Sequence, residues 1–264
     1  MSTKTVQVGR FEIGGPNFVV IAGPCSVESK DQFLTTAEAV KSTGAQMLRG
    51  GIFKLRTKPD TFQGLGSEAF ALVKEVKHQT QMPFFSEITD PRQVGDLMDV
   101  VDVFQVGSRN MHNYALLKEL GQVDKPVLLK RGFSGRIDEW IHAAEYVSSS
   151  GNPQVILCER GIRTFETKTR NTFDVNAIAY VKQHTSLPVI ADPSHATGRS
   201  ELVTPVALAA AAAGADGLIV EVHPNPPSAL SDGEQALDFQ SFSQLMSRLE
   251  KVLIALDRRL APSC

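Results

Sequence analysis

Four residues whose side chains can bind a metal ion lie far apart in the chain: Cys25, His195, Glu221 and Asp232. Each has an ordinary explanation, because a lone cysteine is often a small buried apolar residue and an aspartate before a glycine often forms a turn. Together they offer one thiolate, one imidazole and two carboxylates. This mixture of soft and hard ligands suits Mn, Fe, Co or Zn better than Mg or Ca. The set indicates a divalent metal site if the fold brings its members together.

Basic residues form a second candidate group, because eight of them fall at or just after the ends of predicted strands: Arg49, Lys54, Arg56, Arg109, Lys130, Arg131, Arg160 and Arg163. A single lysine or arginine in such a place is usually a solvated loop charge. Eight in a chain of formal net charge −2 are different, since like charges repel unless an anion lies between them. Arginine suits phosphate and carboxylate. The group predicts a site for more than one anion, such as a phosphorylated carboxylate with a phosphorylated partner.

The bulk composition limits the classes of function. The chain has 264 residues, 42% apolar and 21% charged, which is typical of a globular protein. Its near-neutral charge gives no general attraction to nucleic acid or to a membrane surface, so we expect neither as a partner. Three cysteines without regular spacing favour a reducing compartment over a disulfide framework. Without a signal-peptide pattern or an apolar run that could span a bilayer, the expected location is the cytoplasm.

The elements that must position these residues alternate along the chain. Short β-branched runs predict eight strands, which begin near Asn17, Ala45, Pro83, Val101, Pro126, Gln154, Pro188 and Gly217. Their average spacing is about 29 residues, the size of one strand and one crossover helix. Helical patterns cover 31–40, 137–147 and 238–260, and Asp174 is expected to cap another helix. Glycines 44, 121, 151 and 214 stand where helices are expected to end.

Eight such units predict an α/β fold, a (β/α)8 TIM barrel. We expect residues 1–264 to form this single catalytic domain, with residues 1–16 as a short N-terminal hairpin. The alternative is an open doubly wound sheet, which usually has a glycine-rich fingerprint after its first strand, and GPCSVES does not match that pattern. Nearly every predicted strand also ends in a charged or reactive residue, whereas an open sheet gathers such residues at one switch point. The pattern favours the closed barrel.

Several sequence blocks resemble the 3-deoxy-D-arabino-heptulosonate 7-phosphate (DAHP) synthases, in particular their shorter microbial branch. The blocks include AGPCSVES, LRGGIFKLRTKP, LLKRGFSG, LCERGIRTFE, ADPSHATGR and LSDGEQAL, and the resemblance runs from about residue 23 to residue 237. It implies a metal-dependent TIM-barrel enzyme that condenses phosphoenolpyruvate with erythrose 4-phosphate and releases phosphate, the first step of the shikimate pathway.

The resemblance also implies a role for each candidate residue. Cys25, His195, Glu221 and Asp232 match the metal ligands of the family, and Lys54 is placed to protonate the aldehyde oxygen. Catalysis would rest on Lys54, Cys25 and His195. The implied substrate-binding residues are Glu87, Arg109, Lys130 and Arg160 for phosphoenolpyruvate, Arg49 and Lys54 between the two substrates, and Arg56, Thr57 and Arg163 for the sugar phosphate.

The chain departs from the family pattern in three ways. Leu55 stands where the family usually has a proline, which would fix the backbone between two substrate-binding side chains. We expect this change to affect substrate affinity more than activity. Ser108 replaces a commoner alanine. Some relatives carry a ferredoxin-like or chorismate-mutase-like regulatory domain, and we expect neither here, nor feedback inhibition through such a domain.

Three rival functions remain. The nearest is 3-deoxy-D-manno-octulosonate 8-phosphate synthase, which uses arabinose 5-phosphate but has an asparagine-containing sugar loop where this chain has KLRTKP. A Schiff-base aldolase with Lys130 as nucleophile would leave the metal-type residues without a role. A catalytically silent phosphate-binding barrel would need neither Lys54 nor the metal set. By resemblance, we expect a homotetramer or homodimer.

Overall fold

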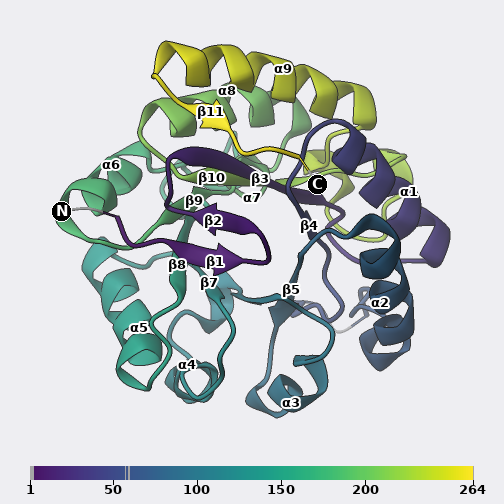
Figure 1. The fold of residues 1–264 in the computed structure, drawn as a ribbon, viewed down its shortest axis with the longest axis horizontal. Helices are drawn as coiled ribbons and strands as arrows, with labels where there is room; N and C mark the ends of the chain where they lie inside the picture. The colour runs from purple at the N-terminus through teal and green to yellow at the C-terminus, as the bar shows by residue number, and fades with distance from the viewer. Residues whose placement is uncertain (1–2, 57, 59, 264) are drawn as a thin grey trace.

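The computed structural model describes residues 3–56, 58 and 60–263, and within them eight parallel strands form a closed barrel with helices around it (Figure 1). The barrel strands are β3 (Asn17–Gly23), β4 (Met47–Arg49), β5 (Phe84–Ile88), β6 (Val103–Val106), β7 (Val127–Lys130), β8 (Val155–Glu159), β9 (Val189–Ala191) and β10 (Gly217–Glu221). Each strand pairs with the next in parallel, and β10 also pairs with β3 over five residues. This last pairing closes the barrel, as predicted, and excludes the open sheet.

Helices connect the strands and cover the outside of the barrel. They are α1 (Lys30–Ser42), α2 (Ala69–Thr80), α3 (Val94–Leu97), α4 (Tyr114–Leu120), α5 (Ile137–Ser149), α6 (Val175–His184), α7 (Pro193–Thr197), α8 (Ser200–Ala212) and α9 (Phe239–Ala255). Short 3-10 turns occur at η1 (Gly66–Glu68), η2 (Pro91–Gln93), η3 (Ser108–Asn110), η4 (Pro226–Ser228) and η5 (Gly233–Gln235). The predicted cap Asp174 is confirmed, since its carboxylate accepts a hydrogen bond from the Ala177 backbone N–H at 3.1 Å. None of the helices in the described part is long and apolar enough to cross a membrane.

The predicted end of the last helix is wrong. The helix stops at Ala255, not at residue 260, because Asp257 adopts a left-handed backbone with φ 55°. Arg259 and Leu260 then form the short strand β11, which pairs with the first residues of β3. The apolar pattern continues past the helix because Leu260 is partly buried as a strand residue.

The amino end of the barrel is covered by an antiparallel hairpin, β1 (Val6–Val8) and β2 (Phe11–Ile13), which lies across the centre of the ring of strands (Figure 1). Its side chains alternate, so Val6, Val8, Phe11 and Ile13 are buried while Gln7 and Glu12 face solvent. The buried four join the apolar residues inside the barrel in one cluster. The hairpin expected within residues 1–16 is thereby confirmed for the described residues.

Candidate metal and substrate site

Each barrel strand changes from apolar to polar or small at the same height. Side chains alternate between the two faces of a strand, so residues two positions apart face the same side. The interior cluster includes Ile21, Met47, Phe85, Val103, Leu128, Cys158, Ile190 and Ile219. Two positions later stand Gly23, Arg49, Glu87, Gln105, Lys130, Arg160, Asp192 and Glu221. This second layer lies at the carboxyl ends of the strands, where TIM-barrel enzymes carry their active sites.

Position 23 in this layer requires glycine for a steric reason. A Cβ added there would lie 2.2 Å from the backbone oxygen of Arg49, and its backbone has φ 153°. Only glycine fits, and the chain then turns outward to place Cys25 beside the mouth of the barrel.

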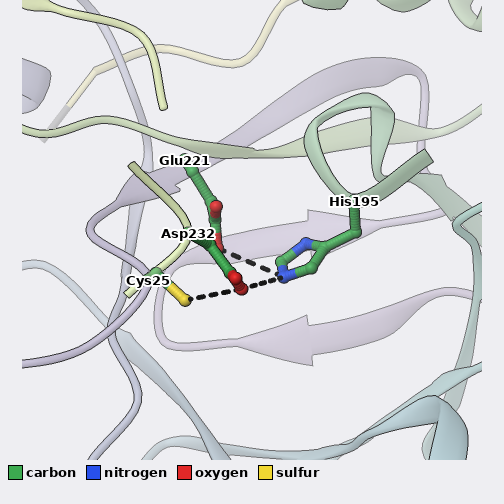
Figure 2. A group of neighbouring side chains, drawn as sticks. All are labelled: Cys25, His195, Glu221 and Asp232. Carbon is green, nitrogen blue, oxygen red and sulfur yellow. Dashed lines mark hydrogen bonds and ion pairs between the residues drawn. The ribbon is translucent and has the colours of Figure 1, made fainter. Parts of the chain in front are cut away.

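The structure brings the four predicted metal ligands together (Figure 2). One candidate ligand atom from each of Cys25, His195, Glu221 and Asp232 lies within 4.8 Å of all the others. The Cys25 Sγ atom is 3.4 Å from Asp232 Oδ2, and the His195 Nε2 atom is 3.2 Å from Glu221 Oε1 and 4.0 Å from Asp232 Oδ2. Atoms that share one metal at about 2.0–2.3 Å are themselves about 3–4.5 Å apart. The spacing of this donor set fits one divalent ion.

The ligand side chains are held by buried neighbours. The Glu221 carboxylate accepts hydrogen bonds from Arg49 Nη1 at 2.8 Å and from Gln235 Nε2 at 2.7 Å. His195 Nδ1 lies 2.8 Å from Asp192 Oδ2, which leaves Nε2 facing the other ligands. Such outer contacts orient metal ligands in proteins.

Burial and local charge set the protonation of the ligands. Burial lowers the pKa of His195 to about 4, so at neutral pH the imidazole is neutral and can offer a lone pair. Burial, with Glu221 as the next cause, raises the pKa of the Cys25 thiol to about 12. Burial opposes ionisation of Asp232, but His195 and nearby cations outweigh it and hold its pKa well below the usual range. A divalent ion in this set would displace the thiol proton.

A cationic cavity of about 240 Å³ adjoins this cluster, with His195 and Asp232 in its lining. Its ionisable lining residues are Arg49, Lys54, Arg56, Lys58, Glu87, Arg109, Lys130, Arg160, Arg170, His195 and Asp232. Lys54 lies at its inner end, with Nζ 3.0 Å from Cys25 Sγ and 3.3 Å from the Cys25 backbone oxygen. Leu55 lines the cavity beside Lys54, and Thr57 lies outside the described residues. Within the described chain, the lining carries far more positive than negative charge, as an anion site requires.

Arg160 presents a buried hydrogen-bond donor that an acceptor bound in this cavity could satisfy. Its side chain is buried, and its Nη1 atom has no hydrogen-bond partner among the described residues. Burial lowers its pKa to about 10. The guanidinium groups of Arg109, Arg160 and Arg163 lie 5.3, 4.8 and 4.6 Å from the centre of the Phe133 ring. An anion in the cavity would give the buried Arg160 nitrogen the partner that it lacks.

Two of the eight predicted basic residues lie elsewhere. Arg131 is buried outside the barrel, where Nη1 contacts Glu159 and Asp174, both at 2.9 Å. It follows Lys130 directly, and consecutive residues in extended chain face opposite sides. Arg163 is exposed and is not among the cavity's lining residues, although it lies over Phe133. Arg131 is therefore not part of the cationic lining of the mouth.

Sequence reasoning also missed residues of the site. Asp192 and Gln105 could have been found, since each stands two positions after an inward apolar residue. Arg170 lies in a loop and Gln235 ends the short turn η5, and neither segment carries a comparable signal. Arg170 Nη1 lies 3.6 Å from Asp232 Oδ1 and donates to Gln235 Oε1 at 2.8 Å. Cys158 is buried in the apolar interior cluster, as expected for a structural cysteine, and Cys264 lies outside the described residues.

Known proteins match nearly the whole chain. A model of the DAHP synthetase I family matches residues 3–257. The phospho-2-dehydro-3-deoxyheptonate aldolase of Thermotoga maritima is 45% identical over 251 residues, which are 95% of this chain and 74% of that protein. The 2-dehydro-3-deoxyphosphooctonate aldolase of Koribacter versatilis is 30% identical over 267 residues, with 93% of this chain and 95% of that protein covered.

Two solved structures from Thermotoga maritima share the fold. The crystal structure of its DAHP synthase superposes with a TM-score of 0.95 and 43% identity, covering 98% of this chain and 76% of that chain. A truncated form of the 3-deoxy-D-arabino-heptulosonate 7-phosphate synthase superposes with a TM-score of 0.92 and 41% identity, covering 98% and 95%.

Proposed function

Because the chain belongs to the DAHP synthetase I family, we propose that it is a 3-deoxy-7-phosphoheptulonate synthase, which condenses phosphoenolpyruvate with erythrose 4-phosphate and releases phosphate. The observation that carries the proposal is that a four-residue metal donor set and a cationic cavity share one mouth of the barrel. Both features belong to a single site that can hold two phosphorylated substrates beside a Lewis acid.

The donor set supports a divalent metal held by Cys25, His195, Glu221 and Asp232. When bound, Mn, Fe, Co or Zn would supply Lewis acidity for the aldehyde oxygen at this position. His195 presents a neutral ring, and Asp232 presents a carboxylate that stays ionised at neutral pH. The one ligand that must lose a proton is Cys25, so metal affinity should rise with pH.

Arg160, Lys130 and Arg109 would bind phosphoenolpyruvate. All three line the cavity, and the unpartnered Nη1 atom of Arg160 suits a phosphate or carboxylate oxygen. Bringing two anionic substrates together costs free energy through charge repulsion, and the cationic lining offsets that cost while fixing their orientation.

Lys54 would act as the proton donor. Burial opposes its charge, but Cys25 and Glu87 outweigh burial and raise the pKa of Lys54, so its ammonium group stays protonated. When carbon 3 of phosphoenolpyruvate forms a bond to the aldehyde carbon, the aldehyde oxygen gains negative charge and accepts this proton. Water then adds at carbon 2, and phosphate leaves as its bond to that carbon breaks.

The outer part of the cavity would hold the sugar phosphate. Arg56, Lys58 and Arg170 line it there, and Arg56 Nη1 lies 3.9 Å from Asp232 Oδ1. Arg163 and Thr57 stay predicted contacts of this phosphate. Arg49 is buried and paired with Glu221, and it would contact both substrates.

Phosphate release from phosphoenolpyruvate by chelator-stripped protein tests the proposal. We expect release with erythrose 4-phosphate only after Mn²⁺ is returned, and none with arabinose 5-phosphate. Release with arabinose 5-phosphate alone would assign the octulosonate synthase activity instead. Release without added metal, accompanied by a borohydride-trapped adduct on Lys130, would favour the Schiff-base aldolase. No release with either sugar would favour the silent phosphate-binding barrel.

The oligomeric state and the response to aromatic amino acids stay predictions. A homotetramer or homodimer would be seen by sedimentation velocity as a species larger than the 28.7 kDa chain. If residues 1–264 act as a single catalytic domain, tyrosine and phenylalanine should not inhibit the isolated protein.

A further inference from the structure

Asp192 lies between the proposed metal ligands and the proposed phosphoenolpyruvate site. It follows β9, is fully buried, and stands two positions after the inward-facing Ile190. Its Oδ2 atom accepts hydrogen bonds from Lys130 Nζ at 2.6 Å and from His195 Nδ1 at 2.8 Å. Its Oδ1 atom accepts from the His195 backbone N–H at 3.0 Å, which caps α7. One carboxylate oxygen therefore bridges a substrate-binding lysine and a metal-binding histidine.

We propose that Asp192 is a positioning residue that couples divalent-metal binding to phosphoenolpyruvate binding, an inference that rests on the proposed function. Asp192 is not among the residues that line the described cavity, whereas Lys130 and His195 both are. A ligand in the cavity can therefore act on Asp192 through these two side chains.

The coupling arises because Lys130 and His195 donate hydrogen bonds to the same oxygen, Oδ2 of Asp192. An ionised carboxylate only accepts hydrogen bonds, so His195 Nδ1 must carry the ring proton, and Nε2 keeps its lone pair for a cation. A cation at Nε2 makes the Nδ1–H group a stronger donor and draws the charge of Asp192 toward His195. Lys130 is then held less tightly and is more available to an anion. The effect is reciprocal, so phosphoenolpyruvate tightens metal binding by the same factor.

Calorimetric titration of chelator-stripped protein with Mn²⁺, with and without phosphoenolpyruvate, measures this coupling. The coupling factor is the ratio of the two Mn²⁺ dissociation constants. We expect a factor of about 5–150 for the unaltered protein. In Asp192→Asn the amide N–H can donate to Nδ1, which moves the ring proton to Nε2. This variant should bind Mn²⁺ about 10–100-fold more weakly without phosphoenolpyruvate, and its coupling factor should fall several-fold.

Asp216→Asn is the matched control. Asp216 is also a buried aspartate, paired with Lys182 Nζ at 2.7 Å and accepting from the Val189 backbone N–H at 2.8 Å. It precedes β10 and so lies at the opposite end of the barrel from Asp192. A general loss of stability should appear in both variants, but Asp216→Asn should keep the unaltered coupling factor.

A second measurement needs no variant at Asp192. In the metal-free protein, the Nδ1–H proton resonance of His195 should move downfield when phosphoenolpyruvate is added, because Lys130 turns toward the anion and leaves Oδ2 to His195.

Three results would overturn the proposal. An Asp192→Asn protein with an unchanged coupling factor would give Asp192 a structural role only, even if its Mn²⁺ affinity fell. An unmoved His195 resonance with phosphoenolpyruvate bound would exclude the shared-oxygen mechanism. An unaltered protein that binds Mn²⁺ but no phosphoenolpyruvate would remove the proposed function, and the coupling with it.

Discussion

At the amino end of the barrel, the hairpin places Val6, Val8, Phe11 and Ile13 against an apolar interior. At the carboxyl end, the same strands end in buried ion pairs, Arg49 with Glu221 at 2.8 Å and Lys130 with Asp192 at 2.6 Å. Burial of apolar surface stabilises the first end. At the second, taking charges out of water costs free energy that pairing only partly returns.

This difference separates stability from function within one barrel. Changes at the apolar end should lower the free energy of unfolding and leave binding intact. Changes at the charged end should remove binding or activity with a smaller effect on unfolding. A variant at one end that changed the property assigned to the other end would contradict this separation.

The largest expected effect is on activity at the charged end. Cys25→Ser should lower the rate of phosphate release by about a thousandfold, because the several kcal/mol supplied by a Lewis acid depend on a thiolate ligand. The matched control is Cys158→Ala, which removes the other buried cysteine from the apolar interior. It should reduce stability and keep activity at saturating Mn²⁺. Equal activity losses in the two variants would contradict the separation.

At the apolar end, Ile13→Ala should lower the free energy of unfolding by about 2–5 kcal/mol, since Ile13 is fully buried on the side of the hairpin that packs against the barrel interior. Urea unfolding measures this loss. Mn²⁺ affinity and phosphate release should stay unchanged well below the unfolding midpoint. A weakened Mn²⁺ affinity in this variant would show that the two ends are coupled through the strands.

Arg160→Lys should raise the KM for phosphoenolpyruvate about 10–150-fold, which corresponds to a charged hydrogen bond of about 1.5–3 kcal/mol. Lysine keeps the charge but loses the planar fork that can bind two anion oxygens. Arg163→Lys is the control, because Arg163 is exposed and should change KM far less. Steady-state kinetics at saturating erythrose 4-phosphate separates them. A larger change at Arg163 would place the anion outside the described cavity.

The smallest effect lies on the outer ring of helices, at the start of α9. Asp238 caps α9 by accepting a hydrogen bond from the Ser241 backbone N–H at 2.7 Å, and this bond lowers the pKa of Asp238. Asp238→Ala should cost about 1 kcal/mol of unfolding free energy at neutral pH. A lowered pKa means that the stabilisation is present above the ordinary value of 3.8 and is lost as the pH falls through the lowered value.

Asp238→Asn is the matched variant for this cap. An asparagine oxygen also caps a helix, so this variant should keep most of the stability at neutral pH and lose the dependence on acid. Urea unfolding as a function of pH measures both. An acid dependence that persists in Asp238→Asn would assign it to other carboxylates.

The strand pattern of the sequence predicted the barrel well, because eight β-branched runs recur with the spacing of one strand and one helix. The sequence also predicted the cluster of four candidate metal donors, because their residue types are chemically distinctive. It could not orient neighbouring residues such as Lys130 and Arg131 by type alone, since both are cations at a strand end. The alternation of side chains decides that question, and it requires a fixed strand register.

The periodicity of the sequence could not predict the contacts that loop residues make. Arg170 lies in a loop 62 residues before Asp232 in the sequence. Only the folded chain brings Arg170 Nη1 to 3.6 Å from Asp232 Oδ1. The end of α9 was missed because Leu260 fits a helical apolar stripe and a short strand equally well. The left-handed backbone at Asp257 decides between them, and no periodicity encodes it.

An absorption titration of chelator-stripped protein with Co²⁺ tests the central claim most directly. We expect a thiolate-to-cobalt charge-transfer band that saturates at one equivalent per chain, is retained in Cys158→Ala and is missing in Cys25→Ser. A protein without a saturable band, or a band that persists in Cys25→Ser, would contradict a metal site built on Cys25.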